Sequence, residues 1–254
     1  MKAVTGKQRE LQQRDDLFLQ LAQDMLLKEG YHGLTMSRIA EAARFSKGTV
    51  YARFACKEEL VAELGFRCSR KRLDMIERSV GFSGKPRERM VALGEATEHF
   101  FRLYPDELRV MHIIDAEAVL EKVPEDQRTR MKSADLRVFE IMASIIGDAI
   151  QCGDLVLPSR SSPAELCLAL WALVDGGASA VLGGLPLTHL GIDDAYGAIA
   201  RACHLLMDGA GWHPLSTEWQ YSAVARQIRE TILYDEARLV SDRLANEGPL
   251  TETS

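Results

Sequence analysis

The sequence predicts an all-α fold. Apolar residues recur at helical spacing in one segment after another, and breaks containing Gly or Pro separate these segments. No stretch has the sustained period-two alternation of a half-buried strand. We therefore expect a small three-helix domain over residues 1–56 and a larger helical domain over residues 57–254, with a long helix from residue 57 shared by both.

The first helix is expected over residues 15–29, with Gly30 ending it. Its apolar stripe consists of Leu17, Phe18, Leu21, Ala22, Met25 and Leu26. The polar residues up to Arg14 are expected to form an unfixed tail. For its cations there are two interpretations, a solvated tail or an arm that reaches a nucleic acid; they are Lys2, Lys7, Arg9 and Arg14.

Residues 34–60 predict two short helices joined by a tight turn, followed by the start of a longer helix. The hydroxyl of Thr35 can cap the first short helix, and Ser46 can cap the second. Between them, residues 43–46 form the turn.

The second short helix, expected over residues 47–54, points to nucleic-acid recognition. Val50 and Phe54 lie four residues apart and share its inner face. The outer face carries small residues, which let the backbone approach base edges, and its flanks carry groups that reach phosphates. The outer residues are Gly48, Thr49 and Ala52, and the flanking residues are Lys47, Tyr51 and Arg53. This is helix-turn-helix geometry.

At these positions the chain resembles the N-terminal DNA-binding domain of the TetR family of transcriptional regulators. The matching residues, in order and at the family's spacing, are Thr35, Ile39, Ala40, Ala43, Ser46, Lys47, Gly48, Tyr51, Phe54, Lys57 and Leu60. The motif covers about the first quarter of the chain, and the rest agrees in being all-helical and of suitable length.

Two residues depart from the family pattern. Arg44 stands where the turn usually has Gly, and it is costly there if its φ is positive. Arg38 stands where an acidic residue usually completes a capping box, and it places a cation in the first helical turn. A nearby phosphate would offset that unfavourable charge.

The DNA-binding residues expected from this reasoning fall into two groups. Lys47 and Thr49 are expected at base edges, on a helix whose Ser46 cap and Gly48 belong to the same surface. The residues expected at phosphates are Thr35, Ser37, Arg38, Tyr51, Arg53 and Lys57.

The distribution of charge along the chain favours DNA binding, although the net charge of the whole chain does not. The net charge is −6, but residues 1–57 carry ten Lys and Arg against six Asp and Glu, which leaves +4 here and −10 in the remainder. A basic head on an acidic body directs a polyanion to one end of the chain.

The composition of the chain limits where the protein is expected in the cell and which chemistry its cysteines can perform. Hydrophobic residues make up 46% of the chain, enough for a core, while no uninterrupted apolar run is long enough to span a bilayer. The N-terminus lacks the apolar middle of a signal peptide, so we expect a cytoplasmic protein without a membrane partner. The cysteines lack paired spacing and are expected to be buried or idle thiols rather than metal ligands; they are Cys56, Cys68, Cys152, Cys167 and Cys203.

A long helix is expected over residues 57–80, with a break at residues 81–86. Tilting of this helix would change the spacing of two DNA-binding heads in a dimer. Its inward residues are expected to be Leu60, Val61, Leu64, Leu73 and Ile76. Further helices are expected at residues 87–104, 106–121, 125–152, 163–182, 193–209 and 217–246.

Residues 164–182 are apolar almost all round, apart from Glu165 and Asp175. Small residues at 176–180 permit tight helix contact. With residues 195–207, this helix is expected to form a four-helix interface with a second copy, as the family resemblance also implies. The alternative is an ordinary monomer core. The last helix extends past the one that usually completes the resembling fold, and it packs on the body or on a partner.

The middle helices predict an apolar, aromatic ligand site, which is where family members hold their inducer. The expected lining is Phe100, Phe101, Tyr104, Met111, His112, Phe139, Met142 and Trp171. Aromatic residues at helical spacing are also typical of plain core. His99 and His112 are either ligands of a metal or a carboxylate, or surface and core histidines.

No catalytic motif is present, and we expect neither an enzyme nor a cofactor or metal. The leading hypothesis is a homodimeric transcriptional regulator, a repressor that binds a near-palindromic operator in double-stranded DNA and is released by a small-molecule effector. One alternative is a helical small-molecule-binding or enzymatic protein that has lost sequence-specific DNA binding. Another is a nonspecific nucleoid-type binder.

Overall fold

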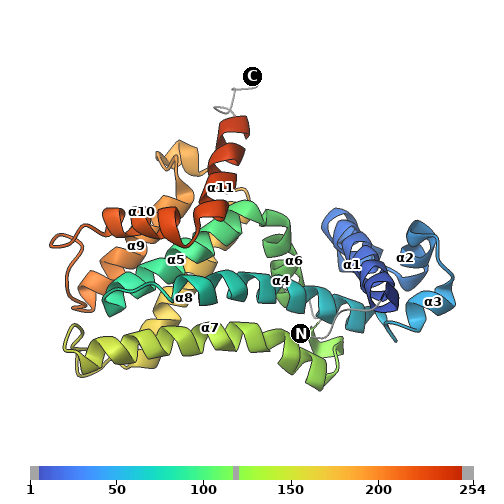
Figure 1. Cartoon of the computed structure of the whole chain (residues 1–254), viewed down its shortest axis with the longest axis horizontal. Helices are drawn as coiled ribbons and strands as arrows, with labels where there is room; N and C mark the ends of the chain where they lie inside the picture. Colours follow the sequence, from blue (N-terminus) through green and yellow to red (C-terminus); the bar gives the residue numbers. More distant parts are fainter. Residues whose placement is uncertain (1–5, 117–119, 248–254) are drawn as a thin grey trace. The chain divides into compact units, whose positions relative to one another are not determined.

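The chain is helical throughout the part that the computed structural model describes, residues 6–116 and 120–247 (Figure 1). No strand occurs among these residues, although Leu155 and Trp212 form an isolated antiparallel bridge. The predicted all-α fold is therefore confirmed. In chain order the elements are α1 (Gly6–Gly33), α2 (Met36–Ala43), α3 (Lys47–Tyr51), α4 (Lys57–Ser79), α5 (Pro86–Leu103), α6 (Pro105–Ala116), the 3₁₀ helix η1 (Leu120–Lys122), α7 (Glu125–Gln151), α8 (Pro163–Leu182), the 3₁₀ helix η2 (Leu187–Leu190), α9 (Ala195–Gly209), α10 (Tyr221–Thr231) and α11 (Tyr234–Glu247).

The chain divides into two compact units. The first unit comprises Met1–Lys71 and Asp106–Ala134, and the second comprises Arg72–Pro105 and Asp135–Ser254. Helices α4 and α7 therefore each contribute residues to both units. The predicted boundary between residues 56 and 57 separates the DNA-binding motif from the rest of the chain, and it is not a division into compact units. This boundary stays a prediction.

An apolar core joins α1, α2, α3 and α4 in the first unit. Phe18 of α1, Ile39 of α2 and Val50 of α3 are completely buried in it. Val110 of α6 and Met131 of α7 pack against the same core. Burial of these side chains fixes how α3 is presented, because a five-residue helix has little stability of its own.

Helix α1 begins at Gly6, so the prediction of an unfixed tail up to Arg14 is wrong for the described residues. Lys7, Arg9 and Arg14 lie on the helix, whereas Lys2 lies outside the described residues. This first part of α1 has no apolar stripe, but it is rich in Lys, Gln, Arg and Glu, which are good helix formers. The expected break at Gly30 is present, with φ 69° and ψ −176°.

The two caps and the strained turn are as the sequence predicts. Thr35 Oγ1 accepts the Arg38 N–H at 3.3 Å, and Ser46 Oγ accepts the Thr49 N–H at 3.1 Å. Arg44 has φ 58° and ψ 37°, the left-handed conformation that Gly adopts most readily. It is the one non-glycine residue with positive φ among those the structure describes.

In the second unit, α8 and α9 pack closely through a glycine. A Cβ added at Gly177 of α8 would lie 2.6 Å from Ile199 Cδ1 of α9, so only Gly fits without a shift. This agrees with the predicted tight helix contact at the small residues 176–180. Gly176 takes no part in it, because a Cβ there would meet nothing within 4 Å. A capping box between Ser162 and Glu165 fixes the start of α8.

The prediction of one long C-terminal helix over residues 217–246 is wrong. The segment forms α10 and α11, separated at Ile232 and Leu233, and both helices pack against α5. Leu233, at the bend, is completely buried. Arg243 of α11 adds hydrogen bonds to the carbonyl oxygens of Arg102 and Leu103 at 2.9 and 3.1 Å.

A buried ion pair anchors the loop between α9 and α10. Arg87 of α5 is completely buried, and its guanidinium donates to Asp208 Oδ1 of α9 at 2.6 Å. It also donates to the carbonyl oxygens of Trp212, Pro214 and His204. These bonds satisfy the terminal nitrogens of the guanidinium, although its buried Nε has no hydrogen-bond partner, and they fix the loop that leads into α10.

Candidate functional site

The outer face of α3 is open to solvent, as the sequence predicts. Lys47, Gly48 and Tyr51 are exposed, with 49% of Tyr51 accessible, while Val50 on the opposite face is completely buried. Thr49 is half-buried, and its hydroxyl lies 2.8 Å from the Ser46 hydroxyl. This face therefore presents a cation, a phenol and bare backbone.

Arg38 is engaged with α1. Its guanidinium forms two parallel bonds to the Glu29 carboxylate, at 2.5 and 2.6 Å, and donates to the Gly33 carbonyl oxygen at 2.6 Å. Through the hydrogen bond to Arg38, the pKa of Glu29 is lowered. The residue that departs from the family pattern thus replaces a capping box by a bidentate link from α2 to the end of α1.

Arg53 and Lys57 also have partners within the first unit. Arg53 Nε donates to Asp15 Oδ2 at 2.6 Å. Lys57 Nζ donates to the Tyr31 carbonyl oxygen at 2.6 Å and lies 3.6 Å from the centroid of the Tyr31 ring. Burial lowers the pKa of Lys57. Any phosphate contact by these two side chains must therefore share or replace an existing bond.

The remaining expected phosphate contacts, Thr35 and Ser37, are exposed at the start of α2. The Thr35 hydroxyl already accepts the capping N–H. Most of the predicted DNA-binding residues are exposed, and the half-buried ones are Thr49, Arg53 and Lys57.

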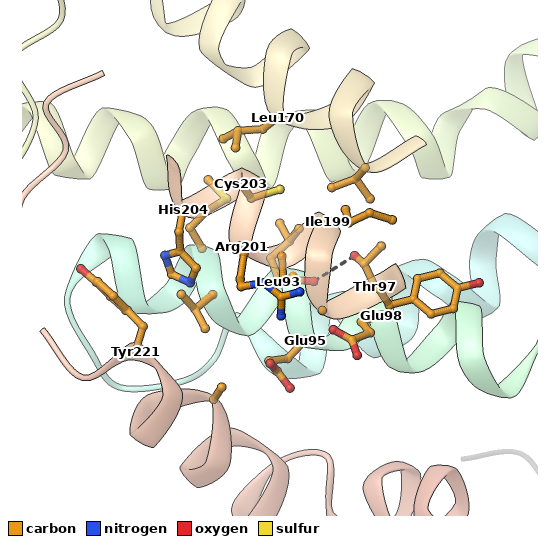
Figure 2. A pocket seen from close by; sticks show the side chains of 18 of the residues that line it. Leu93, Glu95, Thr97, Glu98, Leu170, Ile199, Arg201, Cys203, His204 and Tyr221 are labelled. Carbon is orange, nitrogen blue, oxygen red and sulfur yellow. Dashed lines mark hydrogen bonds between the residues drawn. The ribbon is translucent and has the colours of Figure 1, made fainter. Parts of the chain in front are cut away.

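The second unit contains a cavity of about 790 Å³. Its walls come from the end of α4 and from α5, α7, α8, α9 and α10 (Figure 2). Most of the lining is apolar, with Leu93, Val138, Leu170, Val174 and Ile199 among it. The volume lies within the range of small-molecule sites.

Three of the predicted ligand-site residues line this cavity: Phe101, Met142 and Trp171. Phe100, Tyr104 and Phe139 do not line it but are packed behind it, since Phe100 contacts both Phe101 and Tyr104, and Phe139 contacts Trp171.

The last two predicted ligand-site residues, Met111 and His112, belong to α6 in the first unit and are not brought to the cavity. Met111 packs against the core of that unit instead.

The polar residues of the cavity were not predicted. They include Glu95, Thr97, Glu98, Asp194, Arg201, His204, Tyr221 and Arg229. The signal available in the sequence was charged pairs three residues apart on otherwise apolar helices, such as Glu95 with Glu98 and Arg201 with His204.

Arginines pair with three of the carboxylates of this lining. Glu95 accepts from Arg229 Nη1 of α10 at 2.7 Å, and burial nevertheless raises the pKa of Glu95. Arg102 bridges Glu98 at 2.8 Å and Asp194 at 2.7 Å. Burial alone would raise the pKa of Asp194, but hydrogen bonds from Gly197 and Arg102 bring it below its ordinary value.

His204 lines the cavity and has unused hydrogen-bonding capacity. Its ring stacks on Tyr221 with centroids 4.9 Å apart, and its Nδ1 is buried without a hydrogen-bond partner. Burial, with the nearby Arg87, lowers the pKa of His204, which favours the neutral ring. Burial also raises the pKa of Tyr221 to about 12, and its hydroxyl donates to the Pro214 carbonyl oxygen at 2.6 Å.

No cluster of metal-ligating side chains occurs in residues 6–116 and 120–247. His99 is a buried histidine whose Nδ1 lies 2.7 Å from the Glu95 carbonyl oxygen, the core role that the sequence left open. The cysteines are free, and burial raises the pKa of Cys68 to about 12.

A helix-turn-helix unit with an exposed α3, joined to a helical unit with an internal cavity, defines the class of helix-turn-helix transcriptional regulators. Residues 18–64 match the family model described as "Bacterial regulatory proteins, tetR family". The resemblance inferred from the motif is confirmed. A comparison with curated protein sequences finds no match.

Solved structures share the fold over most of the chain. A TetR-family transcriptional regulator, PfmR from Thermus thermophilus, is 16% identical, with 75% of this chain and 97% of that chain covered and a TM-score of 0.57. A tetR-family regulatory protein from Rhodococcus RHA1 is 18% identical, with coverage of 78% and 97% and a TM-score of 0.62. FadR from Bacillus subtilis, in complex with stearoyl-CoA, is 16% identical, with coverage of 76% and 98% and a TM-score of 0.60.

Proposed function

We propose that the protein is a homodimeric, ligand-responsive repressor that binds a near-palindromic operator and is released by a small molecule. The observation that carries this proposal is the exposed outer face of α3, held by a fully buried inner face and capped by Ser46. A surface of this kind on a helix of this length fits the major groove.

The exposed apolar surface of α8 and α9 supports dimerisation. Leu168 of α8 is 56% exposed, and Leu205 of α9, which also lines the cavity, is 71% exposed. Helix α8 has the length and apolar composition of a membrane span, yet only 22% of its most apolar window is buried within the chain. A second copy presenting the same two helices would cover this surface in a four-helix interface, and we assign α8 to that role in a cytoplasmic protein.

In the proposed complex, two copies of α3 related by a two-fold axis read half-sites in successive major grooves. Lys47 and Thr49 contact base edges, whereas Ser37 and Tyr51 contact phosphates. Thr35, Arg38, Arg53 and Lys57 also belong to this phosphate-facing set. Arg38 can reach a phosphate while keeping Glu29, since a guanidinium has five donors.

The cavity of the second unit supplies the effector site. Its size and apolar lining are typical of a small-molecule site. FadR from Bacillus subtilis, with the same fold, is described in complex with stearoyl-CoA, which supports a ligand role for this unit. An effector that prefers one conformation of the dimer shifts the population toward head spacings that no longer fit the operator.

The alternative of a helical protein without sequence-specific DNA binding arose from Arg38 and Arg44. Both are accommodated without displacing α3: Arg38 pairs with Glu29, and Arg44 takes the left-handed conformation of the turn. We therefore favour the regulator and propose no catalytic activity.

The test is selection of bound duplexes from a random DNA pool at near-physiological salt. Recovery of a two-fold-symmetric site supports the proposal. Salt-sensitive binding without a common sequence would favour the nonspecific binder. Recovery of no duplex by a folded dimer would overturn the proposal.

A further inference from the structure

The charged side chains that line the cavity differ in whether they form ion pairs. The Glu95, Glu98 and Asp194 carboxylates each accept from an arginine, as described above. Asp175, the fourth lining carboxylate, also has an interaction partner. Among the lining guanidiniums, Arg72 pairs with Asp135 and Arg229 pairs with Glu95.

Arg201 is different. It lines the cavity from α9 and makes no ion pair or hydrogen bond within the described residues, although its charge contributes at longer range to the lowered pKa of Asp194. Its Nη1 lies next to Gly197, one turn back along the helix, and it is exposed at the cavity edge. A guanidinium stays charged at every relevant pH and offers five donors in a fork that matches a carboxylate.

One turn further along α9, His204 adds a second unsatisfied group. It lines the same cavity, and its buried Nδ1 has no hydrogen-bond partner. Residues three apart on a helix lie on neighbouring parts of its surface, and Figure 2 shows Arg201 and His204 close together on α9, with His204 beside Tyr221. The cavity therefore has a guanidinium and an imidazole on α9 with unused hydrogen-bonding capacity, while each of its carboxylates already has a partner.

The rest of the wall suits a large apolar body. Phe101, Met142, Leu170 and Trp171 contribute apolar surface, and α10 closes another side with Tyr221. Since an unpaired charge is costly in such surroundings, a charged ligand group belongs at the exposed edge beside Arg201. An amphipathic ligand would satisfy both parts of the cavity.

We propose that the cavity binds an apolar organic carboxylate, whose head pairs with Arg201 and reaches His204 while its body lies among the aromatic and aliphatic side chains. This deepens the proposed function and rests on it, because it names the chemical class of the effector for the same site. It also makes Arg201 the residue that determines specificity for an anion.

The test compares probes that differ only in the charge of the head. Octanoate, dodecanoate and 4-phenylbutyrate are each titrated against the alcohol and the amine of the same skeleton, below micellar concentration. Trp171 and Trp219 line the cavity, so intrinsic fluorescence reports binding directly, without DNA. At least one carboxylate should bind at one per chain, about tenfold or more tighter than its alcohol and its amine.

Arg201→Gln should weaken binding of that carboxylate about 10- to 100-fold and leave its alcohol unchanged, because one charge-assisted contact is lost. Arg226→Gln is the matched control, since Arg226 is exposed on α10 and does not line the cavity. His204→Phe keeps the ring stack on Tyr221 and should cause a smaller loss.

Equal affinity for the three head groups, tighter binding of the amines, absence of carboxylate binding, or unchanged affinity in Arg201→Gln would each overturn the proposal. So would a change in dimerisation, rather than in carboxylate affinity, in that variant. Release of the selected operator by an amine or alcohol would support the proposed regulator function and contradict only the proposal that the effector is a carboxylate. Failure to bind any duplex would instead count against the regulator itself.

Discussion

At the scale of single residues, the exposed face of α3 separates two kinds of DNA contact. Tyr51 lies at the flank, 49% exposed, and is expected to donate its hydroxyl to a phosphate. Thr49 lies on the outer face and is expected at a base edge. Tyr51→Phe should therefore weaken binding about 2- to 10-fold, equally for all sequences, through loss of one hydrogen bond.

Thr49→Ala should instead change preference at particular base pairs. Both variants are measured by binding to the selected operator and to single-base variants of it across a salt series. Unchanged affinity of Tyr51→Phe at every salt concentration would contradict the phosphate assignment.

Arg44 is a second residue whose role can be tested alone. An L-residue in the left-handed region costs about 1–2 kcal/mol, whereas Gly adopts it freely but loses more entropy on folding. Arg44→Gly should therefore raise the free energy of unfolding by about 0.5–1 kcal/mol, as measured by urea denaturation. Arg44→Ala keeps the strain and serves as control; a gain equal to that of Arg44→Gly would show that strain is not the cause.

Residue identity allowed prediction of the caps and of the orientation of α3, because these depend on neighbours within four positions. Thr35 and Ser46 cap α2 and α3, and Val50 is buried, as expected. The partners of Arg38 and Lys57 were not predictable in this way. They are fixed by the approach of α1, which brings Glu29 and the Tyr31 carbonyl oxygen into reach.

At the scale of elements, the link between α5 and the end of α9 depends on Asp208. Burial tends to raise the pKa of Asp208, but hydrogen bonds from Ser216 and Arg87 outweigh it and hold the pKa below the ordinary value of 3.8. The contribution to stability is therefore complete above about pH 4, and it is lost as the pH falls through the lower folded-state value.

Asp208→Asn leaves Arg87 buried without its charged partner and should cost about 3 kcal/mol at pH 7. Denaturation at pH 7, 5, 4 and 3 should show the gap between wild type and variant narrowing below pH 4. Asp193→Asn, at an exposed position just before α9, is the control. A gap that stays constant down to pH 3 would contradict the ion-pair account.

The contact between α8 and α9 gives a paired test on glycines. Gly147→Ala, at an open position of α7, should stabilise by about 0.5–1 kcal/mol through helix propensity. Gly177→Ala should lose that gain or destabilise, because its Cβ would lie 2.6 Å from Ile199 Cδ1. Equal stabilisation in thermal unfolding would mean that Ile199 moves without cost.

Elements were predictable wherever an apolar stripe marks them, as for α5, α7 and α8. The beginning of α1 was missed because it has no such stripe, and the division between α10 and α11 was missed because both halves continue one helical pattern. The cavity shows the limit most clearly. Met111 and Met142 look alike in sequence, and only the packing of distant helices puts one in a core and the other in a cavity wall.

At the scale of the whole molecule, the exposed apolar surface of α8 determines whether the protein acts as one chain or two. Leu168 lies on this surface, outside the cavity lining, and is 56% exposed in the single chain. In the proposed four-helix interface it would be buried against the partner. Leu168→Glu would then place a carboxylate in an apolar contact and should weaken dimerisation about 100-fold or more.

Sedimentation across a concentration series measures this directly, with Leu136→Glu on α7, a leucine that is 62% exposed, as the matched substitution. The Leu168 variant should sediment as a folded monomer and lose tight binding to a full operator, because two linked heads bind far more tightly than one. A dimeric Leu168→Glu protein with full operator affinity would place the interface elsewhere. A Leu136→Glu protein that becomes monomeric would also contradict an α8 interface and would indicate that α7 forms the dimer contact.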